Sequence, residues 1–138
     1  MSPPTGTYQI KNAEFKVHVC ISNTNDGTSV SATTSAATTS LKWTVTKLDN
    51  GNYTFQNIQN VSYASCGDLA PKGHQVVGRG VGKPWVLTES VIKNQYTIAP
   101  VDSTSVYWGL LTGGEGSAVV LGEAAADLKN QWIFQPAV

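Results

Sequence analysis

The chain has 138 residues, enough for one domain with a hydrophobic core of its own. Charged residues make up 13% and cancel to a formal net charge of zero, which argues against a nucleic-acid partner or an anionic membrane surface. No apolar run approaches the roughly 20 residues of a membrane-spanning helix, and the start of the sequence does not resemble a signal peptide. We therefore expect a cytoplasmic protein with no membrane insertion and no nucleic-acid binding.

The first third of the chain predicts short β-strands. Residues 8–10 (YQI) and 17–21 (VHVCI) alternate polar and apolar side chains with a period of two, the pattern of a strand with one buried face. Clusters of Asn, Asp and Gly, such as 23–27 (NTNDG) and 49–52 (DNGN), interrupt the pattern at short intervals. This spacing of turns predicts about four strands in each third of the chain, or about twelve in total.

Two aromatic landmarks recur along the chain. Tyrosines within alternating strands lie 45 and 43 residues apart, and tryptophans with an apolar residue two positions later lie 42 and 47 residues apart. The landmarks are Tyr8, Tyr53 and Tyr96, and Trp43, Trp85 and Trp132. A period in this range indicates an internal repeat. We predict one domain over residues 1–138, built from three repeats at about 5–49, 50–92 and 93–138.

Three four-strand repeats, each too small to bury a core alone, predict an all-β fold of the β-trefoil type. This is a six-stranded barrel capped by three hairpins. A β-propeller is excluded because four blades are its usual minimum. The recurring tyrosines and tryptophans are then expected in the core of the barrel.

Four segments resemble the ricin-B-like β-trefoil lectins of mushrooms, and the resemblance covers the whole chain. They are 6–12 (GTYQIKN), 53–56 (YTFQ), 119–123 (VVLGE) and 130–134 (NQWIF). Residues 42–45 (KWTV) and 51–53 (GNY) are similar, more loosely, to fungal β-trefoil peptidase inhibitors. The resemblance implies a non-catalytic carbohydrate-binding protein. Its alternatives are a serine or cysteine peptidase inhibitor that acts through a surface loop, and a lectin-like subunit that no longer binds sugar and packs on another protein.

In the lectins that the chain resembles, a carboxylate about a dozen residues after the tyrosine of a repeat binds sugar hydroxyls. The corresponding residues here are Cys20, Ser65 and Trp108, and none is acidic. We expect Trp108 to face outward, where an indole can stack on the apolar face of a sugar ring.

The lectins also use a glycine followed by a polar residue on the third strand, and an amide side chain before the closing tryptophan. This pattern is most complete in the third repeat, as Gly122, Glu123 and Asn130. Together with Trp108 they form the predicted sugar site.

The inhibitor alternative depends on the segment 77–84 (VGRGVGKP). Arg79 is the only arginine in the chain, and Lys83 follows it in the same glycine-rich loop. An exposed arginine of this kind can enter the acidic specificity pocket of a trypsin-like protease.

The sequence predicts no catalytic residues, no metal site and no cofactor. His18 and His74 are the only histidines, and with Cys20 and Cys66 they show no metal-ligand spacing. His18 and Cys20 lie two apart on a predicted strand, so their side chains run parallel and do not form a nucleophile and base pair.

Overall fold

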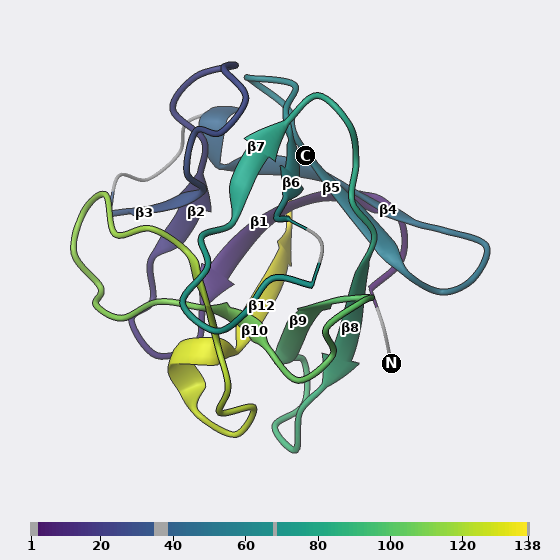
Figure 1. Cartoon of the computed structure of the whole chain (residues 1–138), viewed down its shortest axis with the longest axis vertical. Coiled ribbons are helices and arrows are strands. Elements are labelled where there is room, and N and C mark those ends of the chain that lie inside the picture. Colours follow the sequence, from purple (N-terminus) through teal and green to yellow (C-terminus); the bar gives the residue numbers. More distant parts are fainter. Residues whose placement is uncertain (1–2, 35–38, 68, 138) are drawn as a thin grey trace.

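The structure is a computed structural model that describes residues 3–34, 39–67 and 69–137 (Figure 1). In this part of the chain it contains twelve strands and two short 3-10 helices. The first six strands are β1 (Gly6–Asn12), β2 (His18–Cys20), β3 (Ser31–Thr33), β4 (Lys42–Lys47), β5 (Tyr53–Asn57) and β6 (Tyr63–Ser65). The others are β7 (Val77–Arg79), β8 (Trp85–Glu89), β9 (Tyr96–Pro100), β10 (Tyr107–Gly109), β11 (Val120–Gly122) and β12 (Trp132–Pro136). The 3-10 helices are η1 (Thr39–Leu41) and η2 (Leu128–Asn130).

Six strands close into a barrel. Antiparallel pairing runs from β1 to β4, β5, β8, β9 and β12, and β12 pairs with β1 again. The first and last strands therefore lie side by side, as the purple and yellow arrows of Figure 1 show. The remaining strands form three hairpins, β2–β3, β6–β7 and β10–β11. This arrangement confirms the predicted β-trefoil fold.

The three hairpins meet around a ring of backbone hydrogen bonds. Val30 N donates to Val76 O at 2.9 Å, Val76 N donates to Val119 O at 2.9 Å, and Val119 N donates to Val30 O at 2.8 Å. All three valine side chains are fully buried. The ring gives the cap of the barrel a threefold arrangement.

The recurring aromatic residues occupy equivalent core positions. Each tyrosine stands opposite the tryptophan of its own repeat, as Tyr8 with Trp43, Tyr53 with Trp85 and Tyr96 with Trp132. All three tryptophan side chains are fully buried. Each indole Nε1 donates to a carbonyl in the middle of the neighbouring hairpin strand, at 3.1, 3.1 and 2.9 Å for Val19, Ala64 and Trp108.

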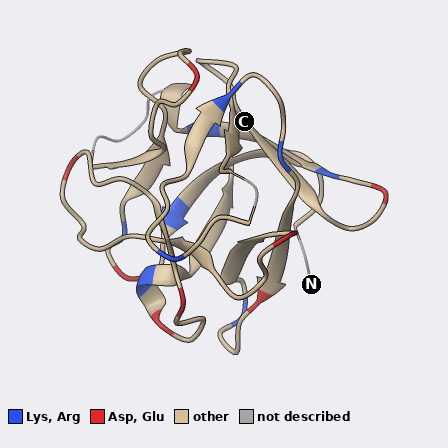
Figure 2. Cartoon of the chain, in the orientation of Figure 1, with Lys and Arg blue, Asp and Glu red and all other residues tan. Residues whose placement is uncertain are grey.

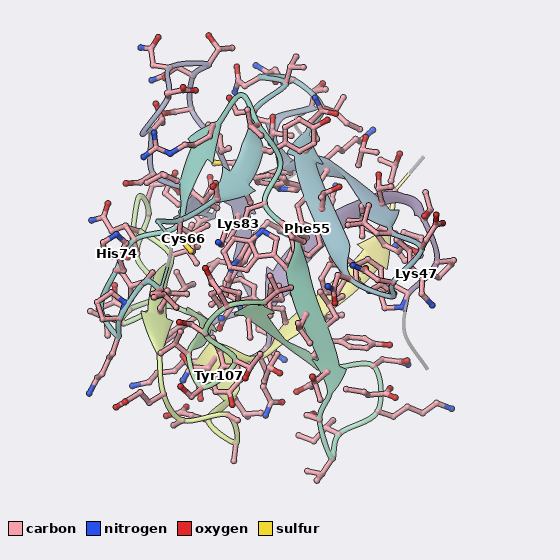
Figure 3. The ribbon with its side chains drawn as sticks, turned by 45° about the vertical axis from the view of Figure 1, so that its right-hand side comes forward. Lys47, Phe55, Cys66, His74, Lys83 and Tyr107 are labelled. Carbon is pink, nitrogen blue, oxygen red and sulfur yellow. The ribbon has the colours of Figure 1, made fainter. Side chains whose placement is uncertain are left out.

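Side chains sort clearly between the interior and the surface. In Figure 3, Phe55 lies in the middle of the molecule, whereas Lys47 and His74 lie near its outline. Lysine, arginine, aspartate and glutamate are interspersed along the ribbon and do not gather on one face (Figure 2). No helix in the described part of the chain has the length and apolar character needed to cross a membrane.

We expect replacement of a barrel tryptophan to cost much of the stability of the fold. Trp85→Ala removes a fully buried side chain and should lower the free energy of unfolding by about 3–5 kcal/mol. Trp85→Phe keeps most of the volume and loses the bond to Ala64 O, so it should cost less. Urea denaturation measures both values. A loss below about 1 kcal/mol for Trp85→Ala would contradict the core assignment.

A second stability prediction concerns Val61, which has a φ of 60° and an exposed side chain. β-Branched residues are strained in the left-handed region, at a cost of about 1–2 kcal/mol. Val61→Asn should therefore raise the free energy of unfolding by about 1 kcal/mol. The matched control is Val81→Asn, because Val81 is also exposed but does not have a positive φ. Equal effects at both positions would show that strain at Val61 is not the cause.

Candidate functional site

A groove in the third repeat holds three of the four residues predicted for a sugar site. It has a volume of about 480 Å³ and is bounded by the β10–β11 hairpin, the segment leading into η2, and the β6–β7 loop. Gly122, Glu123 and Asn130 all line it. The structure thus brings together residues that the sequence separates by up to eight positions.

Asn130 forms a buried part of the groove and is 3% exposed. Its Nδ2 donates to Ala124 O at 2.9 Å, and its backbone N donates to Asp127 O at 2.9 Å. The side chain lies against Gly109 and Gly122, where a Cβ atom at either position would crowd the amide. Glycine at these two positions is therefore what allows an amide to lie across the hairpin.

Glu123 lies at the rim of the groove, directly after β11. Its carboxylate forms an ion pair with Lys72 at 3.5 Å, and both side chains are about two-thirds exposed, at 64% and 67%. Ion pairs between exposed groups contribute about 0–1 kcal/mol, so water and ligand hydroxyls compete easily for this carboxylate. Glu123 is available as a hydrogen-bond acceptor.

Lys72 belongs to the second repeat, and sequence reasoning did not predict it at this site. The backbone around it extends the edge of β11, with Gly73 N donating to Leu121 O at 2.7 Å and Leu121 N donating to His74 O at 2.9 Å. Gly73 has a φ of 88°, which permits the turn before this pairing. No local pattern around Lys72 signals that it meets β11.

Leu111 is a second lining residue that the sequence did not signal. It follows β10, is 73% exposed and supplies an apolar side chain to the groove. The groove therefore combines an amide and one exposed apolar surface with two carboxylates, Glu123 and Asp127, and two ammonium groups, Lys72 and Lys129. Such a set can hydrogen-bond hydroxyl groups and pack against a small apolar face, the combination that a sugar ring presents.

The expectation for Trp108 is wrong. Trp108 is fully buried, and its ring makes edge contacts with Phe55, Trp85 and Trp132 at centroid distances of 5.4–6.1 Å. Trp108 pairs with Leu121 in the middle of its hairpin, as Val19 pairs with Ala32 in the first repeat. A surface ligand does not reach this indole.

The physical reason is the length of one loop. Six residues, 101–106, separate β9 from β10, whereas five residues, 13–17 and 58–62, make the equivalent connections in the other repeats. A shift of one residue moves a side chain to the opposite face of a strand. Gly109, and not Trp108, shares its register position with Cys20 and Ser65.

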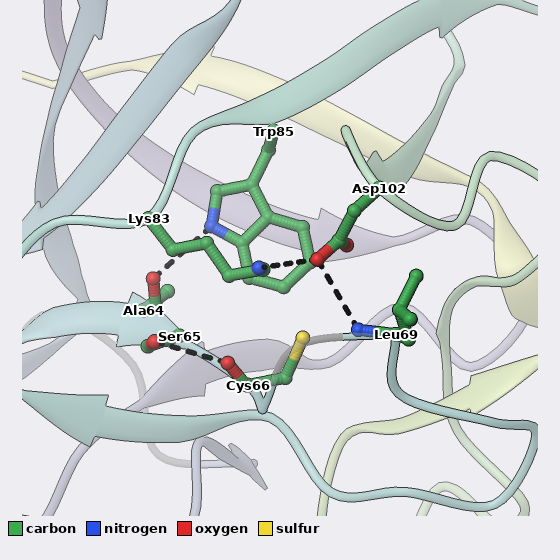
Figure 4. Close-up of polar contacts among 7 residues, drawn as sticks. All are labelled: Ala64, Ser65, Cys66, Leu69, Lys83, Trp85 and Asp102. Atoms are coloured by element: carbon green, nitrogen blue, oxygen red, sulfur yellow. Dashed lines mark hydrogen bonds and ion pairs between the residues drawn. The ribbon is translucent and has the colours of Figure 1, made fainter.

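The residues of the inhibitor alternative are not presented together. Arg79 is exposed at the end of β7. The side chain of Lys83 is only 11% exposed, and its Nζ lies 3.4 Å from Asp102 Oδ2. Figure 4 shows the Lys83 side chain reaching toward Asp102, which also accepts from Leu69 N at 3.2 Å. Lys83 therefore links the second and third repeats and is not displayed on a loop.

No metal site accompanies the groove. In residues 3–34, 39–67 and 69–137, no three His, Cys, Asp or Glu side chains lie close enough together to hold a metal ion. Burial raises the pKa of the Cys20 thiol on β2, which disfavours the thiolate form.

We predict an acid-sensitive contact at Asp102. The Leu69 N–H and then the Lys83 ammonium hold the pKa of Asp102 below its usual 3.8. A carboxylate with a lowered folded pKa stabilises the fold above its unfolded pKa, and this contribution disappears as pH falls through the folded value. Asp102→Asn should therefore lower the Tm at pH 7 and flatten the decline of Tm below about pH 4. Asp49→Asn, at an exposed turn carboxylate, is the control. Equal acid profiles for Asp102→Asn and the wild type would contradict this role.

Comparisons with known proteins show the fold of the chain. No protein-family model and no curated protein sequence matches it. The Rhizoctonia solani agglutinin superposes with a TM-score of 0.90 at 20% identity, covering 99% of both chains. A Macrolepiota procera ricin B-like lectin, solved in complex with lactose, gives a TM-score of 0.87 at 16% identity, again over 99% of both chains. ThreeFoil, a designed threefold-symmetric protein, gives 0.86 at 15% identity, over 96% of this chain and 99% of its own. The chain thus shares the β-trefoil fold with fungal lectins along its full length.

Proposed function

We propose that the chain is a non-catalytic carbohydrate-binding protein and that the groove of the third repeat is its glycan site. The observation that carries the proposal is the grouping of Glu123, Asn130 and Leu111 in one groove of about 480 Å³. The exposed Glu123 carboxylate and the Lys72 ammonium supply an acceptor and a donor for vicinal hydroxyl groups, and the leucine supplies an apolar contact. The shared fold of a fungal agglutinin and a lactose-bound lectin supports the same class of ligand.

The groove favours weak binding to each sugar. The Glu123 carboxylate is solvent-exposed, and the register position where the lectins carry a carboxylate is occupied here by Gly109. Hydrogen bonds that compete with water contribute about 0.5–1.5 kcal/mol each. A dissociation constant near millimolar, or about −4 kcal/mol, follows for a monosaccharide, with tighter apparent binding on multivalent glycan surfaces.

A glycan array probed with multivalently displayed protein tests the proposal. Glu123→Ala and Leu111→Ser change exposed side chains and should each lower glycan retention about tenfold, with unchanged Tm. Arg79→Ala, at an exposed residue outside the groove, is the matched control and should retain glycans like the wild type.

Two outcomes would reject the proposal. If Glu123→Ala and Leu111→Ser both retain glycans fully, the sugar site lies elsewhere on the chain. If the wild type retains no glycan, a lectin-like subunit that packs on another protein becomes the better description. A parallel trypsin and papain inhibition assay, with Arg79→Ala as the test variant, addresses the inhibitor alternative.

A further inference from the structure

A second concave site lies on the outside of the barrel, separate from the groove. We call it the outer cleft. It has a volume of about 380 Å³ and lies between the outer face of the β8–β9 pair and the segment that precedes η2. Val86, Thr97 and Ala99 line it from the barrel, and Ala125 and Gln131 line it from the other side. Most of its lining surface is apolar, although Thr88, Glu89 and Ser90 also line it at the end of β8.

The cleft lies where the outer barrel surface departs from threefold symmetry. Ala99 on β9 is equivalent to Lys11 on β1 and Gln56 on β5, each three residues after the recurring tyrosine. Long polar side chains occupy the equivalent surfaces of the first two repeats. Beside Lys11 in the first repeat, His18 Nε2 lies 3.0 Å from Gln135 Oε1. In the second repeat, Gln56 Nε2 donates to Val61 O at 3.1 Å. In the third repeat a methyl group replaces these chains.

The burial of β9 shows the result of this change. All five residues of β9 are buried, whereas β1 and β5 alternate between buried and partly exposed positions. Thr97 and Ala99 therefore belong to an outward face that the surrounding segments shelter from water. The outer face of β9 thus forms the sheltered floor of a cleft, and a floor of this kind is suited to an apolar ligand.

A buried polar atom adds a specific requirement. Gln131 is 2% exposed, and its Nε2 donates to Ala125 O at 3.0 Å. This bond fixes the orientation of the amide, because the reversed orientation would set two oxygens against each other. Gln131 Oε1 has no hydrogen-bond partner in the described part of the chain. Buried acceptors are normally satisfied, so a donor from a bound molecule would complete this site.

The mouth of the cleft carries two large apolar side chains beside Glu89 and Ser90. Val91 and Ile92, in the turn between β8 and β9, both line the cleft and are exposed. A ligand seated in the cleft would cover part of this apolar surface. The volume lies near the lower end of the range for small-molecule sites, which is about 300–1,000 Å³, so the ligand is small.

We propose that the outer cleft binds a small apolar molecule that carries a single hydroxyl or N–H donor. The apolar body lies on Val86, Ala99 and Ala125, and the donor meets the amide oxygen of Gln131. The site is independent of glycan binding, because Glu123, Asn130 and Leu111 do not line it.

The test is a fluorescence titration of the full chain with 2-naphthol, which has an apolar double ring and one hydroxyl donor. The matched probe is 2-methoxynaphthalene, which keeps the ring and lacks the donor. Ala99→Gln fills the cleft with the residue that the fold already accepts at the equivalent Gln56. Thr44→Gln, a similar enlargement on the outer face of β4, is the control variant. Melting temperatures of both variants check that each remains folded.

We expect saturable binding of 2-naphthol by the wild type and by Thr44→Gln, and at least about tenfold weaker binding by Ala99→Gln. We also expect 2-methoxynaphthalene to bind the wild type at least about tenfold more weakly than 2-naphthol. Absence of saturable 2-naphthol binding, or undiminished binding by a folded Ala99→Gln, would overturn the site. Equal binding of both probes would overturn the role of Gln131. None of these outcomes depends on whether the groove binds glycans.

Discussion

The bond from each barrel tryptophan to a hairpin carbonyl is the constraint on which the rest of the structure depends. The three indoles lie inside the barrel, where an unpaired N–H would cost about 1–3 kcal/mol. Each finds its acceptor on the middle residue of a hairpin strand, namely Val19, Ala64 or Trp108. This hydrogen bond fixes the position of each hairpin relative to the barrel, and it does so at the equivalent residue in all three repeats. The positions of both surface sites follow, because the groove and the outer cleft each include residues of β10.

Departures from threefold symmetry shape both the groove and the outer cleft. One extra residue before β10 turns Trp108 into the core and leaves Gly109 beneath the Asn130 amide. A short side chain at Ala99 leaves space where the other repeats carry Lys11 and Gln56. The groove and the outer cleft lie on either side of the same backbone segment. Asn130 Nδ2 donates to Ala124 O in the groove, and Gln131 Nε2 donates to Ala125 O in the cleft.

The fold could be predicted from the sequence because its signals are periodic. The tyrosines and tryptophans recur in step, and each pair meets across a barrel strand, so their spacing reports tertiary structure directly. The placement of Gly122, Glu123 and Asn130 in one groove follows from the same repeat, since a hairpin and the segment after it are close in every trefoil repeat.

The rest of the two sites could not be read from the sequence. Whether Trp108 faces the core or the surface depends on the length of the loop 101–106. The sequence of this loop does not show that it is one residue longer than its equivalents. Lys72 reaches the groove from another repeat, and contacts between repeats have no local pattern. The outer cleft is open because Ala99 is shorter than the side chains at the equivalent positions of the other repeats. An alanine within a strand does not by itself predict a cleft.

The pairing of β1 with β12 has a consequence for how the chain folds. The register places Tyr8 opposite Pro136, so the barrel closes only when segments at opposite ends of the sequence meet. Bringing such distant segments together costs chain entropy before their side chains pack. Folds with many contacts of this kind therefore fold slowly. Until that pairing forms, both strands expose unpaired edges that can recruit another chain. The pairing that closes this barrel therefore also covers two strand edges that would otherwise be open to another chain.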